Sequence, residues 1–349
     1  MTINSSHLYQ EIHEQPQVIQ RLIDNELDVT LALSQQIHER NISHFVIAAR
    51  GTSDNAARYA NYVLGARNRI LVSLATPSLF SVFKQPPNLS NTLVLGISQS
   101  GKSPDIVSVV AEGKRQGALT AAITNFPQSD LASEADFVID LNAGVEQSVA
   151  ATKTYTSELA VIALLSCCLE GLSKSIEQLQ AMPKAMQATL DINAHIEQIA
   201  ERYRYMERCV VVGRGYNYAT AYELALKLKE LTFSMVEPYS SADFLHGPIA
   251  LLEPGFPVVV IAPTGRMYPK MMSFMQKLQE HRAELVIISN EDEALAMAQS
   301  PLQLPVDTPE WLSALVGIIP GQLFAMYLAH ARGVDVDSPR SLKKVTETI

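Results

Sequence analysis

The sequence repeats itself at a nearly constant offset of 164 residues (209 minus 45), and this repeat limits the folds open to the chain. Residues 45–51 (FVIAARG) align with residues 209–215 (CVVVGRG), and residues 93–101 (LVLGISQSG) align with residues 257–265 (PVVVIAPTG). At an offset of 165 (286 minus 121), residues 121–125 (AAITN) align with residues 286–290 (VIISN). Three matches in the same order at nearly the same spacing predict two copies of one fold.

Each copy alternates short apolar runs with helical stretches, which is the pattern of βαβ units and a parallel sheet. A helix over residues 9–25 precedes the first copy, and a polar helical stretch over 175–207, interrupted at Pro183, joins the copies. The predicted strands are residues 45–49, 70–73, 92–97, 119–124 and 137–140 in the first copy, and 209–213, 258–262, 284–289 and 303–304 in the second.

These elements predict an α/β protein with two similar domains. An N-terminal helical segment (1–30) leads into a first domain (31–175), which carries the candidate site described below. A helical connector (176–207) leads into a second domain (208–349), whose C-terminal tail is expected to close the site.

Composition and charge exclude several classes of function. The formal net charge is −9 and no dense run of Lys or Arg occurs, so we expect no nucleic-acid partner, and an anionic substrate must be held by a local site. The three cysteines, Cys167, Cys168 and Cys209, lack metal-ligand spacing. Cys167 and Cys168 lie in an apolar helical run (159–172) and are interpreted as buried, inert thiols. We expect neither a metal nor a cofactor.

Targeting signals are also not expected. The N-terminus lacks the basic and apolar pattern of a signal peptide, and the apolar stretches are judged too short or too interrupted to span a bilayer. We therefore expect a cytoplasmic protein that does not bind membranes.

The loop of residues 98–103 (SQSGKS) is the candidate phosphate site. It follows a predicted strand and precedes a helix predicted to begin at Pro104, so its backbone N–H groups and the helix dipole favour an anion. A serine-rich turn that only caps the helix is the alternative. The matching loop of the second copy (262–267, APTGRM) lacks most of the donors, whereas a structural cap would be needed in both copies. The added side-chain donors are Ser98, Gln99, Ser100 and Ser103.

A second turn, residues 50–54, is expected beside this loop because it follows the first strand of the same copy. Gly51 permits the turn. Thr52 and Ser53 could either cap the following helix or contact the sugar of a phosphorylated sugar bound at the serine loop. The sequence leaves both possibilities open.

The helix predicted over residues 219–230 is the candidate acid–base element. Its leucines at 224, 228 and 231 form a core stripe, while Glu223, Lys227 and Glu230 share another face at i, i+4 and i+7. A solvated salt-bridge face is the alternative. His246 follows in a Gly-Pro loop, where it is either structural or a titrating group. Aldose–ketose isomerisation needs a base that moves a proton between C1 and C2, and a group that opens the ring.

The tail of residues 337–344 (DSPRSLKK) is the last candidate. A frayed basic end is the alternative, but Pro339 and a short helix predicted after it favour docking. The amine of Lys344 could then bond to, or condense with, a carbonyl group.

Six short motifs are shared with one known family: RGTS (50–53), SQSG (98–101), ATK (151–153), ALKLKE (225–230), HGP (246–248) and DSPR (337–340). Together they resemble the sugar isomerase (SIS) domain family, and within it the isomerase half of glucosamine-6-phosphate synthase and its stand-alone deaminase relatives. The resemblance extends from about residue 30 to the end. It implies two tandem flavodoxin-like SIS domains, each a parallel sheet flanked by helices, in a chain that pairs into a homodimer.

The resemblance also implies roles for particular residues. Glu230 matches the base that shuttles the C1–C2 proton, with Lys227 nearby. His246 matches the ring-opening histidine, which the neighbouring subunit donates in the family. Lys344 matches the C-terminal lysine that can form a Schiff base. The residues that match sugar or phosphate contacts are Ser53, Ser98, Gln99, Ser100, Val149 and Ser103, the last standing where the synthase has threonine.

Departures from the family pattern shape the expected reaction. The synthase carries an N-terminal glutaminase with a cysteine after the initiator Met, whereas here Thr2 follows Met1 and the first 150 residues contain no cysteine. Ala151 and Lys102 stand where the synthase usually has serine and glutamate. We therefore expect hydrolytic, isomerising deamination of a phosphorylated amino sugar, glucosamine 6-phosphate, to fructose 6-phosphate and ammonia.

Two other functions stay open. One is a deglycase that cleaves a 6-phosphofructosyl-amino acid on a similar scaffold. The other is a non-catalytic SIS module that senses a sugar phosphate, which would need the serine loop but not Glu230, Lys227 and His246 together. We find no DNA-binding segment in this sequence that would support a role as a sensor.

Overall fold

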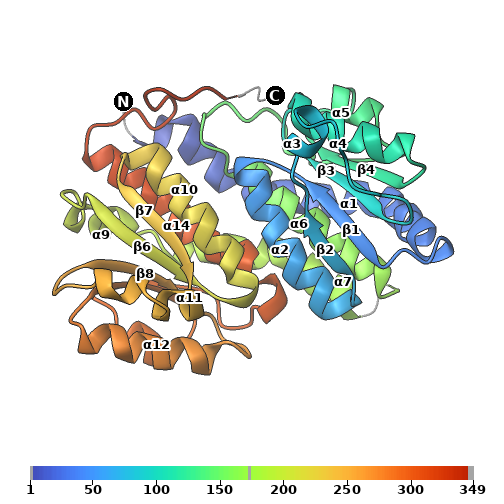
Figure 1. Ribbon diagram of the computed structural model, residues 1–349. Helices are drawn as coiled ribbons and strands as arrows, with labels where there is room; N and C mark the ends of the chain where they lie inside the picture. Colours follow the sequence, from blue (N-terminus) through green and yellow to red (C-terminus); the bar gives the residue numbers. More distant parts are fainter. Residues whose placement is uncertain (1–2, 172–173, 345–349) are drawn as a thin grey trace. The chain divides into compact units, whose positions relative to one another are not determined.

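The computed structural model describes residues 3–171 and 174–344, and it contains two five-stranded parallel sheets (Figure 1). The first sheet has the order β2-β1-β3-β4-β5 and the second β10-β9-β8-β6-β7. Counted from the β7 edge, the second sheet repeats the order of the first. This is the flavodoxin-like order, so the predicted pair of α/β domains is confirmed. The strands are β1 (His44–Ala48), β2 (Leu71–Leu74), β3 (Leu93–Ile97), β4 (Leu119–Thr124), β5 (Phe137–Asp140), β6 (Arg208–Gly213), β7 (Met235–Ser240), β8 (Pro257–Ile261), β9 (Glu284–Ser289) and β10 (Ser300–Gln303).

Strand β7 is the one that the sequence analysis missed. It pairs in parallel with β6, from Arg208 opposite Met235 to Gly213 opposite Ser240. Its sequence, MVEPYS, contains a charged residue and Pro238, so it does not form an apolar run. Proline is tolerated here because β7 is an edge strand. The repeat itself could have located it, since β2 begins at residue 71 and 71 plus 164 is 235.

The helices follow the predicted pattern with three differences. The leading helix α1 runs over 33 residues, further than the predicted 9–25, and the connector is divided into α7, α8 and α9. Pro183 lies in the first turn of α8, where proline is tolerated. The helix predicted after Pro339 is absent from residues 340–344, and the remainder of that prediction lies outside the described residues. The α-helices are α1 (His7–Glu39), α2 (Gly51–Asn68), α3 (Ser78–Ser81), α4 (Pro104–Arg115), α5 (Asp130–Ser133), α6 (Lys153–Leu169), α7 (Lys174–Gln180), α8 (Met182–Ile192), α9 (Ile196–Arg202), α10 (Tyr218–Thr232), α11 (Ser241–Leu245), α12 (Tyr268–Glu280), α13 (Asp292–Leu295) and α14 (Ser313–Ala331).

The described residues form two compact units. The first-copy unit comprises residues 17–146, 153–171, 174–181 and 343–344. The second-copy unit comprises residues 3–16, 147–152 and 182–342. The continuous domain boundaries given above stay a prediction.

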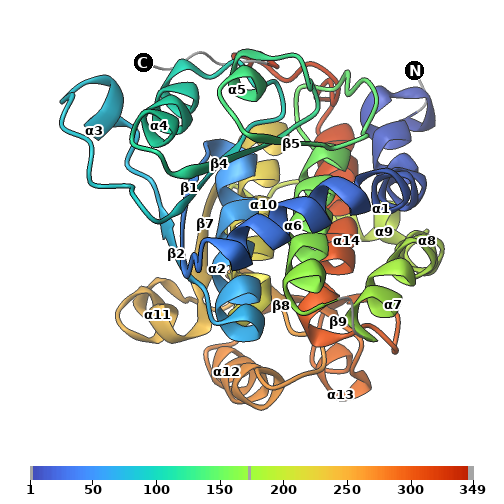
Figure 2. The same cartoon turned by 90° about the vertical axis from the view of Figure 1, so that its right-hand side faces the viewer.

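Both faces of the first-copy sheet are buried, as a parallel sheet requires. On one face, Val46, Val94 and Ala122 pack against Ile106 and Val110 of α4. Helices α2 and α6 pack against each other (Figure 2). Helix α6 is buried along almost its whole length, which explains why it carries apolar residues on all sides.

All three cysteines are buried, which confirms the prediction made for Cys167 and Cys168. Burial raises the pKa of Cys167 to about 11 and the pKa values of Cys168 and Cys209 to about 12. All three thiols therefore stay protonated and unreactive near neutral pH.

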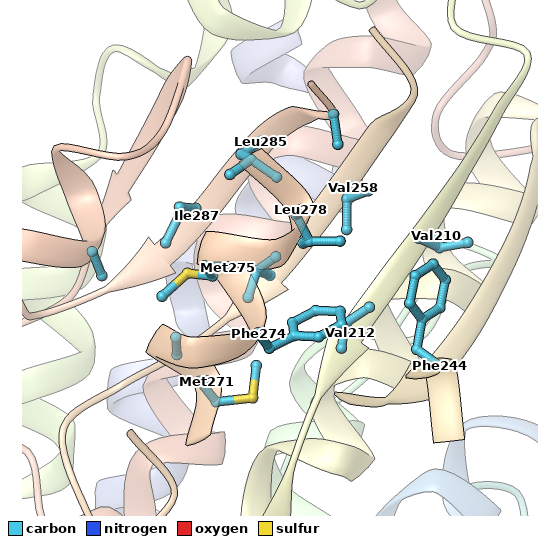
Figure 3. Packing of buried hydrophobic residues seen from close by; sticks show 14 of the residues in the cluster. Val210, Val212, Phe244, Val258, Met271, Phe274, Met275, Leu278, Leu285 and Ile287 are labelled. Carbon is cyan, nitrogen blue, oxygen red and sulfur yellow. The ribbon is translucent and has the colours of Figure 1, made fainter. Parts of the chain in front are cut away.

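One hydrophobic cluster of the second-copy unit lies between its sheet and α12 (Figure 3). Val210, Val258 and Leu285 point from neighbouring strands toward Phe274 and Leu278 of the helix. The ring of Phe274 also meets that of Phe244 edge to face, with centroids 5.7 Å apart. This cluster fixes α12 against the sheet.

Helix α14 corrects one expectation. It belongs to the stretch Glu310–Ala331, which is long and apolar enough to cross a membrane, contrary to the prediction that no stretch is. Its Pro320 does not end the helix. The most apolar window is 94% buried inside the protein, which is the burial of a core helix. Gly321 lets it approach α10 closely, because a Cβ there would lie 2.8 Å from Leu224 Cδ1.

We predict that Phe274→Ala lowers the free energy of unfolding by about 3–5 kcal/mol, because it leaves a cavity between α12 and the sheet. Denaturant unfolding followed by circular dichroism measures this change. Tyr205→Ala is the matched control, since Tyr205 is 90% exposed and its truncation should change stability by less than about 0.5 kcal/mol. Equal effects of the two substitutions would contradict the packing described here.

Candidate functional site

The serine loop joins β3 to α4 at the carboxyl edge of the first-copy sheet. Gly101 holds a φ of +63°, and a Cβ there would lie 2.0 Å from Ser129 Oγ, so only glycine fits. The Gly101 carbonyl accepts a hydrogen bond from Leu131 N at 3.0 Å, and the Gln99 carbonyl accepts one from Asn125 N at 3.1 Å. The loop is therefore held in one shape by the segment that follows β4.

The hydroxyls of this loop are arranged to donate. Ser98 Oγ accepts the N–H of Gly101 at 3.2 Å, and Ser100 Oγ accepts the N–H of Lys102 at 3.3 Å. A hydroxyl that accepts still has its own hydrogen to give, and among the described residues neither hydroxyl donates a hydrogen bond. Ser103 is the N-cap residue of α4, but its side chain makes no capping bond. This observation weighs against the interpretation of the loop as a simple cap.

The turn after β1 adds two polar contacts. Ser53 donates from Oγ to Oε1 of Glu158 at 2.6 Å, and both residues are buried. Ser53 therefore does not cap α2, and Thr52 lies half-buried in the first turn of that helix. Arg50 pairs through Nε with Oδ2 of Asp105 at 2.8 Å. The sequence analysis did not find Glu158, which lies in an apolar helix.

Helix α10 brings together the three predicted acid–base residues. Lys227 Nζ lies 3.3 Å from Glu223 Oε1 and 2.6 Å from Glu230 Oε2. The side chains of Lys227 and Glu223 are 1% and 0% exposed, so the alternative of a solvated salt-bridge face is wrong. Glu230 is 22% exposed and is the member of the cluster that a ligand can reach.

Electrostatics keep this cluster charged. Burial alone would lower the pKa of Lys227, but the carboxylates of Glu223 and Glu230 outweigh it and raise that pKa above its ordinary value. Lys227 is therefore an ammonium near neutral pH. This ammonium lies within ion-pair distance of both Glu223 and Glu230.

His246 lies at the exposed end of α11. Its backbone N–H bonds to the Asp243 carbonyl at 3.0 Å, and Gly247 follows with a φ of +133°. Its side chain is exposed and makes no hydrogen bond with Lys227 or Glu230. The structure thus places His246 in the second-copy unit without joining it to the ion cluster.

Val149 lies on a short segment of the second-copy unit, residues 147–152, that two acidic residues hold in place. The buried Glu11 carboxylate accepts hydrogen bonds from the backbone N–H of Gln147 and from the N–H and hydroxyl of Ser148. Val149 N donates to the Asp337 carbonyl at 3.0 Å. The Asp337 carboxylate accepts the first N–H groups of α1, at 3.0 and 2.8 Å. Asp337 belongs to the DSPR motif, whereas nothing in the sequence had indicated Glu11.

Lys344 belongs to the first-copy unit and is ion-paired. Its Nζ lies 2.6 Å from Oε2 of Glu146, which is fully buried and also accepts the hydroxyl of Thr154 at 2.8 Å. The amine is held by this ion pair, so a Schiff base would require the contact with Glu146 to open first. Upstream in the tail, Arg340 lies over the ring of Phe233, 4.1 Å from its centroid.

The chain belongs to the SIS domain family, whose model matches residues 37–166 and 203–332, one match in each sheet-containing half. The fold is thus that of a phosphosugar isomerase-type protein.

Among its relatives is the glutamine–fructose-6-phosphate aminotransferase (isomerizing) of Gloeobacter violaceus, 34% identical over 97% of this chain and 58% of the relative. The enzyme of the same name from Aquifex aeolicus is 32% identical over 97% of this chain and 57% of its own length. The chain therefore spans somewhat over half of these relatives.

Solved structures agree on the fold. A Silicibacter pomeroyi protein assigned as a phosphosugar isomerase has a TM-score of 0.85 at 30% identity, covering 95% of this chain and all of its own. The C-terminal domain of the glucosamine-fructose-6-phosphate aminotransferase of Francisella tularensis has a TM-score of 0.85 at 26% identity, covering 97% of this chain and all of its own. The Thermotoga maritima glucosamine-6-phosphate deaminase, at 21% identity and a TM-score of 0.79, shares the fold.

We predict that Lys227→Met lowers the free energy of unfolding by about 3–5 kcal/mol, because it leaves the buried Glu223 carboxylate without its cation. The folded pKa of Lys227 is raised, so its stabilisation is complete below the unfolded value of about 10.4 and is lost only as the pH rises through the folded value. Denaturant unfolding at neutral pH therefore measures the whole effect.

Two further variants control this prediction. Lys229→Met removes an exposed lysine from the same helix and should leave stability nearly unchanged. Glu223→Gln combined with Lys227→Met removes both buried charges and should recover part of the loss. A single Lys227→Met variant as stable as the parent protein would contradict the assignment.

Proposed function

We propose that this chain is an isomerising deaminase that converts glucosamine 6-phosphate into fructose 6-phosphate and ammonia. The observation that carries the proposal is the Glu223–Lys227–Glu230 cluster, in which Lys227 and Glu223 are buried and the Glu230 carboxylate is partly exposed and reachable. The coarser role, a phosphosugar isomerase-type protein, rests on the family and on relatives that act on fructose 6-phosphate by name.

The serine loop would hold the phosphate. Its hydroxyl hydrogens and backbone N–H groups provide neutral donors at the N-terminus of α4, whose dipole favours an anion. The Lys102 side chain, exposed at the same loop, adds a positive charge close by. Ser53, fixed by Glu158, and Val149, fixed by Asp337, would contact the sugar.

Glu230 would carry the proton. After His246 assists ring opening, the carboxylate removes the C2 proton of the open-chain aldose and returns a proton to C1. The C2 amine thereby becomes an imine, and water adds to it and expels ammonia, which leaves the C2 ketone of fructose 6-phosphate. Lys227 would position Glu230 through their 2.6 Å contact.

The roles of His246 and Lys344 and the cellular location are further parts of this proposal. His246 is proposed to act across the interface of a homodimer, consistent with its exposed position at the end of α11. Lys344 is proposed to leave Glu146 and approach the carbonyl of the open sugar. A cytoplasmic location fits a phosphorylated substrate.

The test is the release of ammonia and fructose 6-phosphate from glucosamine 6-phosphate in the absence of glutamine. Equal amounts of both products are expected. Tight binding without turnover would favour the sensor, and release of an amino acid from a 6-phosphofructosyl-amino acid would favour the deglycase.

We predict that Glu230→Gln lowers kcat by about 10²–10⁴-fold, the usual contribution of a general base, while substrate affinity changes little. Steady-state kinetics and calorimetric titration measure the two quantities separately. Glu280→Gln, which changes an exposed glutamate at the end of α12, is the control and should retain activity. Turnover near the parent level in Glu230→Gln would remove Glu230 from its role.

We predict that replacing Ser98 and Ser100 together with alanine weakens phosphosugar binding at least about tenfold, because two donors to a charged group are lost. Ser108→Ala is the matched control, since its hydroxyl donates within α4 to the Asp105 carbonyl. Unchanged affinity in the double variant would place the phosphate elsewhere.

A further inference from the structure

A small crevice opens at the carboxyl edge of the second sheet, within the second-copy unit. It lies between the turn after β6 and the loop after β8. The chain leaves β6 for β7 on one side and later adds β8 on the other, so this is the point where the strand order reverses. Open parallel sheets bind ligands in crevices at such points. The crevice is lined by Arg214, Tyr216, Thr264, Met267, Met271 and Glu310, among others.

The internal repeat relates this crevice to the serine loop. In the first copy the same reversal lies between β1 and β3, where the turn 50–54 and the loop 98–103 are found. Adding 164 places Arg214 at the position of Arg50 and Thr264 at that of Ser100. Thr264 retains a hydroxyl, and its backbone N–H is held by Asn290 Oδ1 at 2.7 Å.

The arginines differ between the copies in one decisive respect. Arg50 is neutralised by Asp105, but the position 164 residues after Asp105 is Pro269. Arg214 consequently makes no ion pair or side-chain hydrogen bond with any residue in 3–171 or 174–344. The guanidinium of Arg214 can therefore bind a ligand, whereas the equivalent guanidinium of Arg50 is already paired with Asp105.

The opposite wall of the crevice carries a carboxylate. Glu310 Oε1 accepts the N–H of Met267 at 3.3 Å. Its side chain lies directly over Gly265, where a Cβ would be 2.3 Å from Glu310 Cδ. An anion alone would meet both an attractive Arg214 and a repulsive Glu310 in this small space.

We propose that this crevice is a second binding site, distinct from the deaminase site, for a small molecule that carries an anionic group and an ammonium group. The anion pairs with Arg214, Glu310 receives the ammonium, and Thr264 offers a hydroxyl between the two loops. Amino-sugar phosphates and free amino acids share this chemistry. The pairing of opposite charges distinguishes such ligands from simple sugar phosphates.

Methionine methyl groups allow a direct test on the full chain. Met267 and Met271 line the crevice, whereas Met186 is buried in α8. With ¹³C-methyl methionine, titration by glucosamine 6-phosphate or L-alanine should shift the Met267 and Met271 signals saturably and leave Met186 in place. Glucose 6-phosphate, which has the phosphate without the amine, should bind this site at least about tenfold more weakly, as expected for one lost charged contact. A response to L-alanine alone would identify the ligand class as free amino acids. A response to glucosamine 6-phosphate alone would identify it as amino-sugar phosphates.

Matched variants assign the response to the crevice. Arg214→Gln should weaken binding at least about tenfold, while Arg266→Gln, an exposed arginine of the same loop that does not line the crevice, should leave it unchanged. Glu310→Gln should remove the preference for an amine. The proposal is overturned if no probe shifts Met267 and Met271 at millimolar concentration, or if the shifts persist unchanged in Arg214→Gln. The methyl signals report binding and not turnover, so an inactive protein still tests this site, and the Glu230→Gln variant limits consumption of glucosamine 6-phosphate during the titration.

Discussion

The parallel pairing of the strands is the constraint on which the rest of the structure depends. Because every strand of a sheet points the same way, all strand-to-helix turns of that sheet gather at one edge. Both faces must be covered by helices, so polar groups are excluded from the faces and are collected at this edge. The serine loop, the Arg50 turn and the crevice at Arg214 all occupy such positions. The chemistry of the protein is thereby restricted to a few short loops and to the helices that begin in them.

The ion cluster on α10 places charged side chains inside the protein, where their burial costs free energy. Glu223 and Lys227 bring charges into a helix face that packs inside the second-copy unit, and burying a charge without a partner costs several kcal/mol. Three charges at i, i+4 and i+7 satisfy one another, and this spacing is available only on a helix. Replacing them with apolar residues would often be neutral or stabilising, so stability alone does not account for them. A catalytic role of Glu230 would account for this arrangement.

The sequence was sufficient for the repeat, for the alternation of strands and helices, and for several element bounds, while the flavodoxin-like order was implied by the family resemblance. Pro104 begins α4 as predicted, and β4, β5 and β9 have the predicted bounds. β7 was missed because an edge strand can contain Pro238 and a charge without losing its pairing. The partners of the site residues, such as Glu158 for Ser53 and Glu146 for Lys344, could not be predicted either. They lie 105 and 198 residues away, and only the folded chain brings each pair together.

The two copies show how one architecture can provide two different sites. In the first copy, Asp105 pairs with Arg50 and the serine loop carries neutral hydroxyl groups, which would suit the proposed phosphate. In the second copy, Pro269 replaces the aspartate and the Glu310 carboxylate bonds to the loop at Met267. The crevice is therefore lined by one positive and one negative side chain, Arg214 and Glu310. The backbone turn is the same in both, with Gly51 and Gly215 at φ values of +53° and +62°. Since the turn is retained, a difference in binding preference between the two proposed sites would arise from side chains at equivalent positions and not from the fold.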